Sequence, residues 1–525
     1  MILGALGGTH AHAQVAEPFA AGVRWSHDPG GGPDWIAEEV SFAGRDQFVW
    51  SQAGGVGAHS ALLRSDGGVA LVDREEALLT GASAVRRNAS GERADRVFSL
   101  LQTNMGGQGL RSTEVHAYAP FDTNRNVDMP SIWSHDMGAL TLGEPYLETD
   151  RAGSIAVASI WLSGQNAVQV DVLDGTNGGL LATGILPGLA LNSVRVSADG
   201  SHIAIAAGLD FYVLDAQVQV LHHEPITSTL SDLALSADGS VIAASGMAGT
   251  RLWQAQAMGY TQYRWMPAHP QSSTAQQTIS VEVDLSDDGS ILAVAQWSFV
   301  GMKETAFELW DTVLDVRSFR EVQPGGLNGM QNLPTQARVT PDGKRAAFAV
   351  WGNGVDPEVL LVDRDSATIV QGFDLPGSAL ALDLDGTGTR VAVAHKLNHA
   401  QTFHSRGAFV LLDSGEREIQ VVSATRPGHG LHVAAGHSGA GIVLFLLGQP
   451  SQGAQVQGVS GMLLLDRSRL AVRAVPADLN GGAQVSLQVP TNWPLPELPF
   501  AFQAAFRLPA GTALTDSIVE PICLH

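Results

Sequence analysis

Residues 193–208 read SVRVSADGSHIAIAAG, and this stretch decides the fold. It joins an alternating apolar strand, a turn on Asp-Gly and a second apolar strand rich in Ala, Val and Ile. Four more copies follow: DLALSADGSVIAASG at 232–246, VEVDLSDDGSILAVAQW at 281–297, ARVTPDGKRAAFAVWG at 337–352 and ALDLDGTGTRVAVAH at 381–395. Such a recurrence indicates a repeat architecture, in which each copy forms one supersecondary unit.

Each copy is followed by another strand pattern, such as FYVLD at 211–215 or FELWD at 307–311. Weaker copies near residues 46, 96 and 154 bring the total to eight candidate units between Trp35 and Ser414. Alternation with a period of two places one face of each strand in a core, and glycine in the turn accepts a positive φ. A spacing of roughly 40–60 residues fits one four-stranded antiparallel sheet per unit. We therefore predict an all-β chain.

The SxDGxxxA phrases and the ending Leu309-Trp310-Asp311 resemble the WD-repeat and YVTN-type β-propeller families of exported bacterial proteins. This resemblance implies a β-propeller over residues 35–424. Seven blades result if the first unit only supplies a strand that closes the ring, and eight result if every unit is a blade. Closure of the ring matters because it leaves no open edge strand to recruit other chains.

The Asp-Gly period stops after residue 426, and prolines cluster at positions 490, 494, 496 and 499. Loss of the period and a proline-rich stretch indicate a separate module. We predict a small β-sandwich-like module at 427–525. The stretches DLNGGAQVSLQVP at 478–490 and FAFQAAF at 500–506 resemble the C-terminal β modules of many exported bacterial proteins.

The overall charge is strongly negative, with 52 acidic against 30 basic residues and a net charge of -22. Nucleic acids and anionic membrane surfaces are therefore poor partners, because both attract clusters of Lys and Arg. No stretch approaches the about 20 apolar residues of a spanning helix. The single cysteine, Cys523, excludes an intramolecular disulfide.

The first residues, MILGALGGTHAHAQ, form a short apolar run that ends in Ala11-His12-Ala13. A small-x-small pattern of this kind is typical of a secretory cleavage site. We therefore predict a signal segment at 1–13 and a mature protein that is secreted or held in the periplasm or cell envelope.

Two motifs contain the residue types of a serine hydrolase. GHSGAG at 436–441 has its second glycine at the wrong offset from Ser438, and the strand pattern IVLFLLG follows where a nucleophile elbow needs a helix. WSHD occurs at 25–28 and again at 133–136, but neighbouring residues on an extended chain point to opposite sides. A glycine-rich turn and equivalent loop contacts on two blades are the favoured interpretations.

Three further motifs suggest ions or nucleotides. His395, His399 and His404 have a spacing that could offer three imidazoles to zinc, although surface histidines are favoured. DLDGTG at 383–388 is similar to a calcium loop but lacks the later bidentate glutamate, so a hairpin turn is favoured. GGVG at 54–57 lacks the Lys-Ser/Thr ending of a phosphate loop. We assign no catalytic, cofactor-binding or metal-binding residue.

Taken with the resemblance, these observations predict an exported, non-catalytic binding or scaffold protein that presents propeller loops to a protein or cell-envelope partner. The alternative is a propeller enzyme, a lactonase- or glycosidase-like hydrolase with its site at the mouth of the central channel. Its candidate residues are Glu148, Asp232, Glu282 and Asp284. Converging carboxylates and histidines would favour the enzyme, and a small or apolar lining would favour the binding module.

Overall fold

The computed structural model describes the following residues: 22–28, 35–43, 48–55, 59–64, 69–73, 85–90, 96–104, 111–118, 131–138, 145–247, 249–268, 278–298, 301–302, 304–327, 329–399, 406–414, 418–421, 430–436, 442–448, 450–455, 459–460, 462–465, 471–477, 482–488, 501–508 and 511–514. The predicted signal segment 1–13 lies outside these residues, as do His404, Ser438 and Cys523. Within them there is no helix long and apolar enough to cross a membrane.

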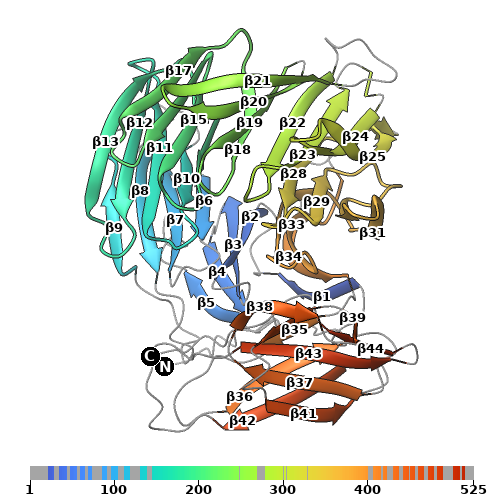
Figure 1. The fold of residues 1–525 in the computed structure, drawn as a ribbon. Helices are drawn as coiled ribbons and strands as arrows, with labels where there is room; N and C mark the ends of the chain where they lie inside the picture. Colours follow the sequence, from blue (N-terminus) through green and yellow to red (C-terminus); the bar gives the residue numbers. More distant parts are fainter. Residues whose placement is uncertain are drawn as a thin grey trace, which may run out of the picture.

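The described chain is all-β, and its strands form eight four-stranded antiparallel sheets and four further sheets of two to five strands. Seven of the eight sheets take four strands that follow one another in sequence, and the eighth joins β32, β33 and β34 to β1. Figure 1 shows the sheets succeeding one another in chain order, with β2 brought back beside β33. This is the arrangement of a β-propeller.

The strands of these eight sheets have the following bounds: β1 (Gly22–His27), β2 (Trp35–Ala43), β3 (Phe48–Gly55), β4 (His59–Arg64), β5 (Val69–Asp73), β6 (Val85–Ser90), β7 (Val97–Asn104), β8 (Arg111–Tyr118), β9 (Trp133–Asp136), β10 (Tyr146–Thr149), β11 (Ile155–Leu162), β12 (Ala167–Asp174), β13 (Leu180–Pro187), β14 (Ser193–Val196), β15 (His202–Ala207), β16 (Asp210–Asp215), β17 (Val220–Pro225), β18 (Leu230–Leu235), β19 (Val241–Gly246), β20 (Gly249–Gln256), β21 (Gly259–Pro267), β22 (Thr278–Leu285), β23 (Ile291–Ser298), β24 (Glu304–Asp311), β25 (Val316–Pro324), β28 (Pro334–Val339), β29 (Arg345–Val350), β30 (Val359–Asp363), β31 (Thr368–Phe373), β32 (Ala379–Leu384), β33 (Arg390–Lys396) and β34 (Gly407–Asp413). A short extra hairpin is formed by β26 (Gly326–Leu327) and β27 (Met330–Gln331).

The first strands of successive sheets lie against one another. Contacts run from β2 through β6, β10, β14, β18, β22 and β28 to β32, and β32 in turn contacts β2. At this last contact the Phe42 N–H donates to Asp383 Oδ2 at 2.7 Å, although the two residues are 341 positions apart. The pairing of β1 with β34 joins the two ends of the sheet series a second time.

The second strand of each strong repeat is buried on both faces. In β15, residues 203–207 are all fully buried. Ile203 and Ile205 pack with the preceding sheet, whereas Ala204 and Ala206 pack with the following one. The prediction of one buried face per strand is therefore wrong for these strands, because each sheet is stacked between two others. It describes the outermost strands better, such as β17, where exposed and half-buried residues alternate.

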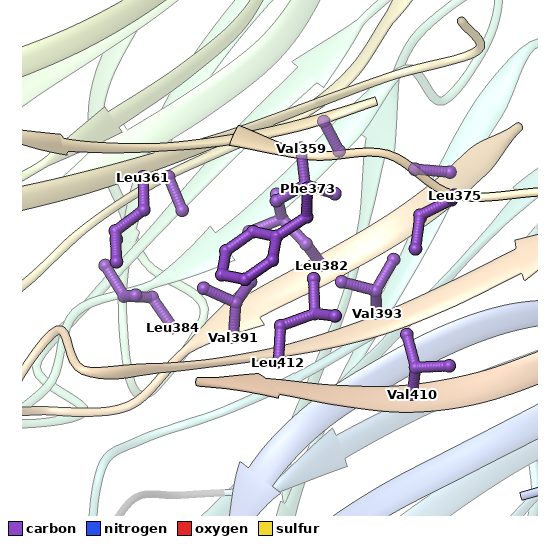
Figure 2. Packing of buried hydrophobic residues seen from close by; sticks show 13 residues of the cluster. Val359, Leu361, Phe373, Leu375, Leu382, Leu384, Val391, Val393, Val410 and Leu412 are labelled. Carbon is purple, nitrogen blue, oxygen red and sulfur yellow. The ribbon is translucent and has the colours of Figure 1, made fainter. Parts of the chain in front are cut away.

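The packing between the last two sheets shows how the stack is filled (Figure 2). Phe373 and Leu375 lie against Leu382, Val393 and Leu412 in one cluster of buried side chains. Burying a Val, Leu or Phe side chain contributes about 1.5–3 kcal/mol each. Small residues such as Ala347 and Ala349 on β29 belong to the same cluster and allow the sheets to approach closely.

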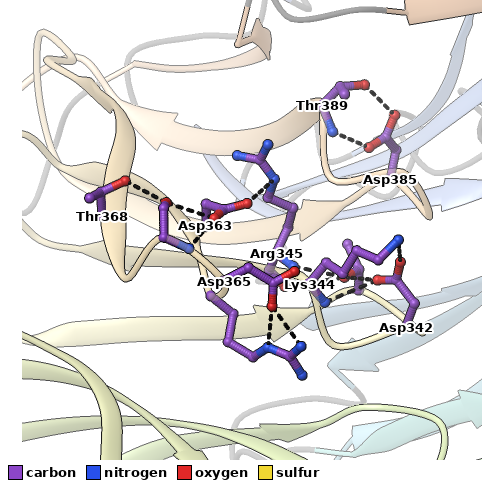
Figure 3. Close-up of polar contacts among 11 residues, drawn as sticks. Asp342, Lys344, Arg345, Asp363, Asp365, Thr368, Asp385 and Thr389 are labelled. Atoms are coloured by element: carbon purple, nitrogen blue, oxygen red, sulfur yellow. Dashed lines mark hydrogen bonds and ion pairs between the residues drawn. The ribbon is translucent and has the colours of Figure 1, made fainter. Parts of the chain in front are cut away.

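The turn between the first and second strand of each repeat is held by its own side chains. In the turn before β29, Asp342 accepts hydrogen bonds from Thr340 and from the backbone of Lys344, and Asp385 holds Thr389 in the same way in the next sheet (Figure 3). The shared geometry depends on the glycine, since Gly343 and Gly388 both have φ near +70°. The calcium-loop motif at 383–388 is thus a hairpin turn, as predicted.

Strands after residue 417 form sheets of their own. One has the order β35-β36-β42, one has the order β39-β44-β43-β37-β41, and β38 pairs with β40. These strands are β35 (Glu418–Val421), β36 (Gly430–Gly436), β37 (Ile442–Gly448), β38 (Pro450–Gln455), β39 (Val459–Ser460), β40 (Met462–Leu465), β41 (Ala471–Pro476), β42 (Gly482–Gln488), β43 (Ala501–Leu508) and β44 (Gly511–Leu514). Residues 442–448 form strand β37 where a nucleophile elbow needs a helix, so the structure does not support that interpretation of the GHSGAG motif, whose residues 437–441 lie outside the described residues.

We expect the Asp238→Ala variant to lower the free energy of unfolding by about 1–2 kcal/mol at pH 7, because two hydrogen bonds to Asp238 are lost. Burial alone would raise the pKa of Asp238, but hydrogen bonds from Ser240 and Ser236 lower it below its ordinary 3.8. A lowered folded-state pKa gives stability that is present above pH 3.8 and is lost as the pH falls through the lowered value. Urea unfolding curves measure the difference, and Asp365→Ala on the surface is the control. An equal loss in both variants would contradict this role of the turn.

Candidate functional site

The first strands of the sheets surround a cavity of about 420 Å³. Its lining comes from β2, β10, β14, β18, β22, β28 and β32, and it is predominantly polar. Six carboxyl groups and two guanidinium groups face this space, namely those of Glu38, Glu39, Glu148, Asp232, Glu282, Asp383, Arg195 and Arg338. Charged side chains therefore dominate the centre of the ring, and acidic ones are in excess.

One position of the repeat supplies half of these charges. It lies five residues before the positive-φ glycine of the turn, on the last part of the first strand. In successive sheets this position holds Glu148, Arg195, Ala234, Asp284, Arg338 and Asp383. Because each first strand presents the same face to the centre, this single position generates a belt of alternating sign.

Arg195 connects two carboxylates from the sheets on either side of it. Its Nη1 lies 2.7 Å from Glu148 Oε1, and its Nη2 lies 2.8 Å from Asp232 Oδ1. Burial alone would lower the pKa of Arg195, but the carboxylates around it, Asp232 first, raise it above the ordinary value. The guanidinium therefore stays charged and fixes Glu148 and Asp232 on opposite sides of itself.

Three aspartates use one oxygen to hold the next first strand. Asp232 accepts from Val283 N–H at 3.3 Å, and Asp284 accepts from Val339 N–H at 2.8 Å. Asp383 does the same with the backbone of β2 across the closing contact. These carboxylates therefore connect neighbouring sheets through hydrogen bonds at the edge of the cavity.

Glu282 and Asp232 form a pair of neighbouring carboxyl groups in the cavity lining. Burial and then the nearby Asp232 raise the pKa of Glu282 well above its ordinary value, while Arg195 and Arg338 act in the opposite direction. Burial and a neighbouring carboxylate both favour the protonated form of a carboxyl group. Glu282 thus keeps a proton at pH values where an ordinary glutamate is ionised.

The same trend holds for the other acids around the cavity. Burial raises the pKa of Asp284 to about 6, although Arg338 and the bond from Val339 oppose the shift. Burial also raises the pKa values of Glu148 and Asp383, against the effects of Arg195 and Arg338 respectively. The two guanidinium groups do not compensate for all of the negative charge, so the cavity retains protons.

The turn end of the cavity is crossed by an ion pair. Arg151, in the turn after β10, pairs through both terminal nitrogens with the carboxylate of Asp287, in the turn after β22. Two other sheets stand between these turns in the sequence of the ring. Backbone hydrogen bonds also join turn to turn, for example from Ala237 N–H to Asp287 O at 2.8 Å. Access to the cavity is therefore favoured from the opposite end, where the first strands begin.

The four sequence candidates for a channel-mouth site do come together. Glu148, Asp232 and Glu282 line the cavity, and Asp284 lies beside it on the same strand as Glu282. The sequence interpretation missed Arg195, Arg338 and Asp383. The signal that identifies them is their common offset from the turn glycine, which places them on the same face as Glu148.

The two WSHD motifs lie far from the cavity on outermost strands rather than on loops. β1 and β9 occupy the same edge position in their sheets, next to β34 and β8. Trp25 is buried and the adjacent Ser26 is exposed, as alternation on a strand requires. His135 instead binds Asp171 on another sheet, at 3.2 Å. Within each motif the side chains diverge, so no triad forms.

The histidine motif is also divided. His395 is buried on β33, where its Nδ1 is 2.7 Å from Lys396 O, and burial lowers its pKa. His399 lies half-buried near Glu358. The expectation of surface histidines is therefore wrong for His395, because the strand extends further than the sequence suggested. Among the described residues no group of three or more His, Cys, Asp or Glu could hold a metal ion.

No family model and no curated protein matches the sequence. Among solved structures, the chain is similar to the β-propeller domain of Cps50 (Swd1) from Myceliophteria thermophila, with 13% identity and a TM-score of 0.42. The match covers 64% of this chain and 97% of that one. The assignment of the fold rests on the strand pairing within this chain.

We expect Arg195→Met to lower the free energy of unfolding by about 2–3 kcal/mol at pH 8, since it leaves Glu148 and Asp232 without their cation. We expect a smaller loss than the about 3–5 kcal/mol that is typical when a fully buried ion pair is broken, because the Arg195 side chain is 22% exposed. The loss should shrink at pH 5, where protons can neutralise the carboxyl groups. Chemical unfolding at both pH values tests this, with Arg364→Met on the surface as control. A pH-independent loss would contradict the assignment.

Proposed function

We propose that this chain is an exported, non-catalytic binding and scaffold protein, built on a closed eight-bladed β-propeller, whose central cavity receives a cationic group from a protein or cell-envelope partner. The observation that carries the proposal is the cavity itself, in which six carboxyl groups face two guanidinium groups. A partner that brings a positive charge would offset this imbalance.

The strand pairing of the described residues supports the proposed count of eight blades. Eight four-stranded sheets are present, and the sheet that contains β32 both pairs with β1 and contacts β2. In this arrangement the first sequence unit forms the complete blade β2 to β5, and the closing strand is β1, which precedes that unit and pairs with β34. We further propose that the strands after residue 417 form the separate C-terminal module and serve attachment or sorting.

The cation preference follows from the charges. Full ionisation would leave an excess of four negative charges in the lining, from six carboxylates and two guanidinium groups. Burial raises the pKa values of Glu282 and Glu148, and nearby carboxylates add to the effect. An entering cation would be attracted by the same field and would displace protons from these groups. A volume of about 420 Å³ accommodates a small ligand or one long side chain.

A binding role is favoured over catalysis because the carboxylates already have structural partners. Glu148 and Asp232 are both held by Arg195, and Asp232 and Asp383 also accept backbone hydrogen bonds from the next sheet. Side chains fixed in this way present a rigid, charged wall to a ligand. They have little freedom to change partners during a reaction cycle.

A second candidate function has one specific observation in its favour. The lining is polar rather than small or apolar, and Glu282 retains a proton beside the Asp232 carboxylate. A protonated carboxyl group and an ionised carboxylate are the two kinds of group that an acid–base hydrolase such as a glycosidase uses. In that case Glu282 would be the proton donor and Glu148 or Asp232 the base.

Calorimetric titration with butylguanidine and its neutral analogue butylurea tests the binding proposal. We expect butylguanidine to bind, with an affinity that rises from pH 5 to pH 8, and butylurea not to bind. Glu282→Gln should weaken butylguanidine binding by about tenfold at pH 8, because it removes one charged hydrogen-bond acceptor. Asp365→Asn, on the surface, should leave it unchanged.

Equal binding of the two probes, or no binding of either, would overturn the cation proposal. Hydrolysis of aryl glycosides or lactones by the full chain, abolished in Glu282→Gln but not in Asp365→Asn, would assign the cavity to the enzyme instead.

Export has its own test. Fractionation of the source cells, followed by mass measurement of the intact protein, should find it in the envelope, periplasm or medium with Gln14 as its first residue. A chain that retains residues 1–13 in the cytosol would contradict the proposed signal segment.

A further inference from the structure

We propose that Glu358 acts as a pH-sensitive latch for the loop 351–357, which lies between β29 and β30 at the end of the ring where the first strands begin. This inference is independent of the proposed cation binding, because none of its residues lines the cavity. It concerns the buried carboxyl group of Glu358, of which only one oxygen accepts a hydrogen bond among the described residues.

Glu358 is anchored through only one of its two carboxyl oxygens. Oε2 accepts a hydrogen bond from the Leu375 N–H at 2.7 Å, and the Glu358 backbone carbonyl accepts one from Val350. Oε1 is buried and has no hydrogen-bond partner among the described residues. The side chain as a whole is 0% exposed. Water therefore does not replace the missing partner at the surface, and an ionised carboxylate is poorly supported here.

Two titratable groups face Glu358. The Asp374 carboxyl group lies near enough for its negative charge to raise the pKa of Glu358. On the other side, His399 Nδ1 is 3.8 Å from Glu358 Oε1 and 3.4 Å from the Trp351 carbonyl oxygen. Burial and the Asp374 charge raise the pKa of Glu358 to about 7, against the effect of the Leu375 N–H.

The loop is pressed directly onto this carboxyl group. Gly352 has φ +80°, and a Cβ built on it would lie 2.4 Å from Glu358 Oε1. The rest of the loop is folded on itself, since Asn353 Oδ1 accepts from the N–H groups of Val355 and Asp356. Hydrogen bonds hold the loop to its surroundings, such as Trp351 N–H to Leu333 O at 2.9 Å within its own sheet and Asn353 Nδ2 to Pro324 O at 3.3 Å in the neighbouring sheet. The state of Glu358 therefore affects how firmly the loop is held.

The latch lies at the end of the ring where the first strands begin. Leu333 directly precedes the first strand β28, and Thr335 in that strand donates to Ala379 O, the first residue of β32. Thr335 and Leu380 both line the cavity. Opening of the loop would thus alter the rim through which a ligand enters.

The direction of the pH effect on loop opening follows from the difference between the pKa of Glu358 in the closed loop and its ordinary pKa. A folded-state pKa of about 7 against an ordinary 4.5 means that the closed loop is stabilised by the protonated acid. This stabilisation is present below pH 4.5, falls as the pH rises through 7, and is constant above that. The opening constant of the loop should therefore rise about tenfold between pH 6 and pH 8.

Hydrogen exchange of the backbone amides in 351–357 of the full-length protein tests the latch. After correction for intrinsic exchange, we expect the opening constant to rise about tenfold from pH 6 to pH 8 in the wild-type protein. Glu358→Gln should remove the rise, and Asp374→Asn should move it to lower pH. Asp365→Asn, on the surface, is the control and should behave like the wild type.

A loop whose opening does not change with pH, or changes equally in Glu358→Gln, would overturn the latch. If Glu358→Gln unfolds the chain, Asp374→Asn still decides the question. An unshifted transition in that variant would remove the carboxyl pair from the explanation.

Discussion

The structure depends on the burial of each sheet between two others. Second strands such as β15 are apolar on both faces, and each face belongs to a different cluster of buried side chains. Alanine at alternate positions keeps the sheets close enough to stack, while Ile, Val and Phe fill the space between them. A sheet of this composition at the end of an open stack would expose one apolar face, so the stack is stable only when every sheet has two neighbours. Contacts from β32 to β2 supply the last pair of neighbours.

Stacking the sheets in a ring brings their first strands to one centre, and this creates an electrostatic problem. A repeated charged position would place six or more like charges together. Two features reduce the repulsion between these charges. Arg195 and Arg338 stand among the acids, and backbone N–H groups donate hydrogen bonds to the carboxylates. These positive and polar groups do not offset all of the negative charge. Burial and the nearby Asp232 raise the pKa of Glu282 well above its ordinary value, so Glu282 retains a proton. Stability of the ring and the charge of the cavity are thus set by the same residues.

Much of the ring could be predicted from the sequence, because each strong repeat carries its own local signals. The alternation of apolar residues, the turn glycine and the following strand pattern all lie within 20 or so residues, where local geometry decides the conformation. Three strands per unit were visible in this way. The outermost strands, such as β13 and β17, were not, since exposed edge strands carry a weaker apolar pattern.

The site was harder to predict for a physical reason. Glu148, Asp232 and Glu282 come from three different sheets, and no local motif records that they meet. Their partners Arg195 and Arg338 occupy the same repeat position as acids elsewhere, which only an alignment on the turn glycine makes visible. The number of blades could not be predicted from the sequence either, because strand β1 precedes the first repeat and pairs with the last one.

The central claim is that the cavity holds more negative charge than its arginines offset and therefore retains a proton on Glu282. Carbon-13 NMR of the full chain labelled at glutamate side-chain carboxyl carbons measures this directly, with Glu282→Gln to assign the signal. The account predicts that the Glu282 carboxyl titrates well above the ordinary value of 4.5. A Glu282 signal that titrates near 4.5, as an exposed glutamate does, would contradict it.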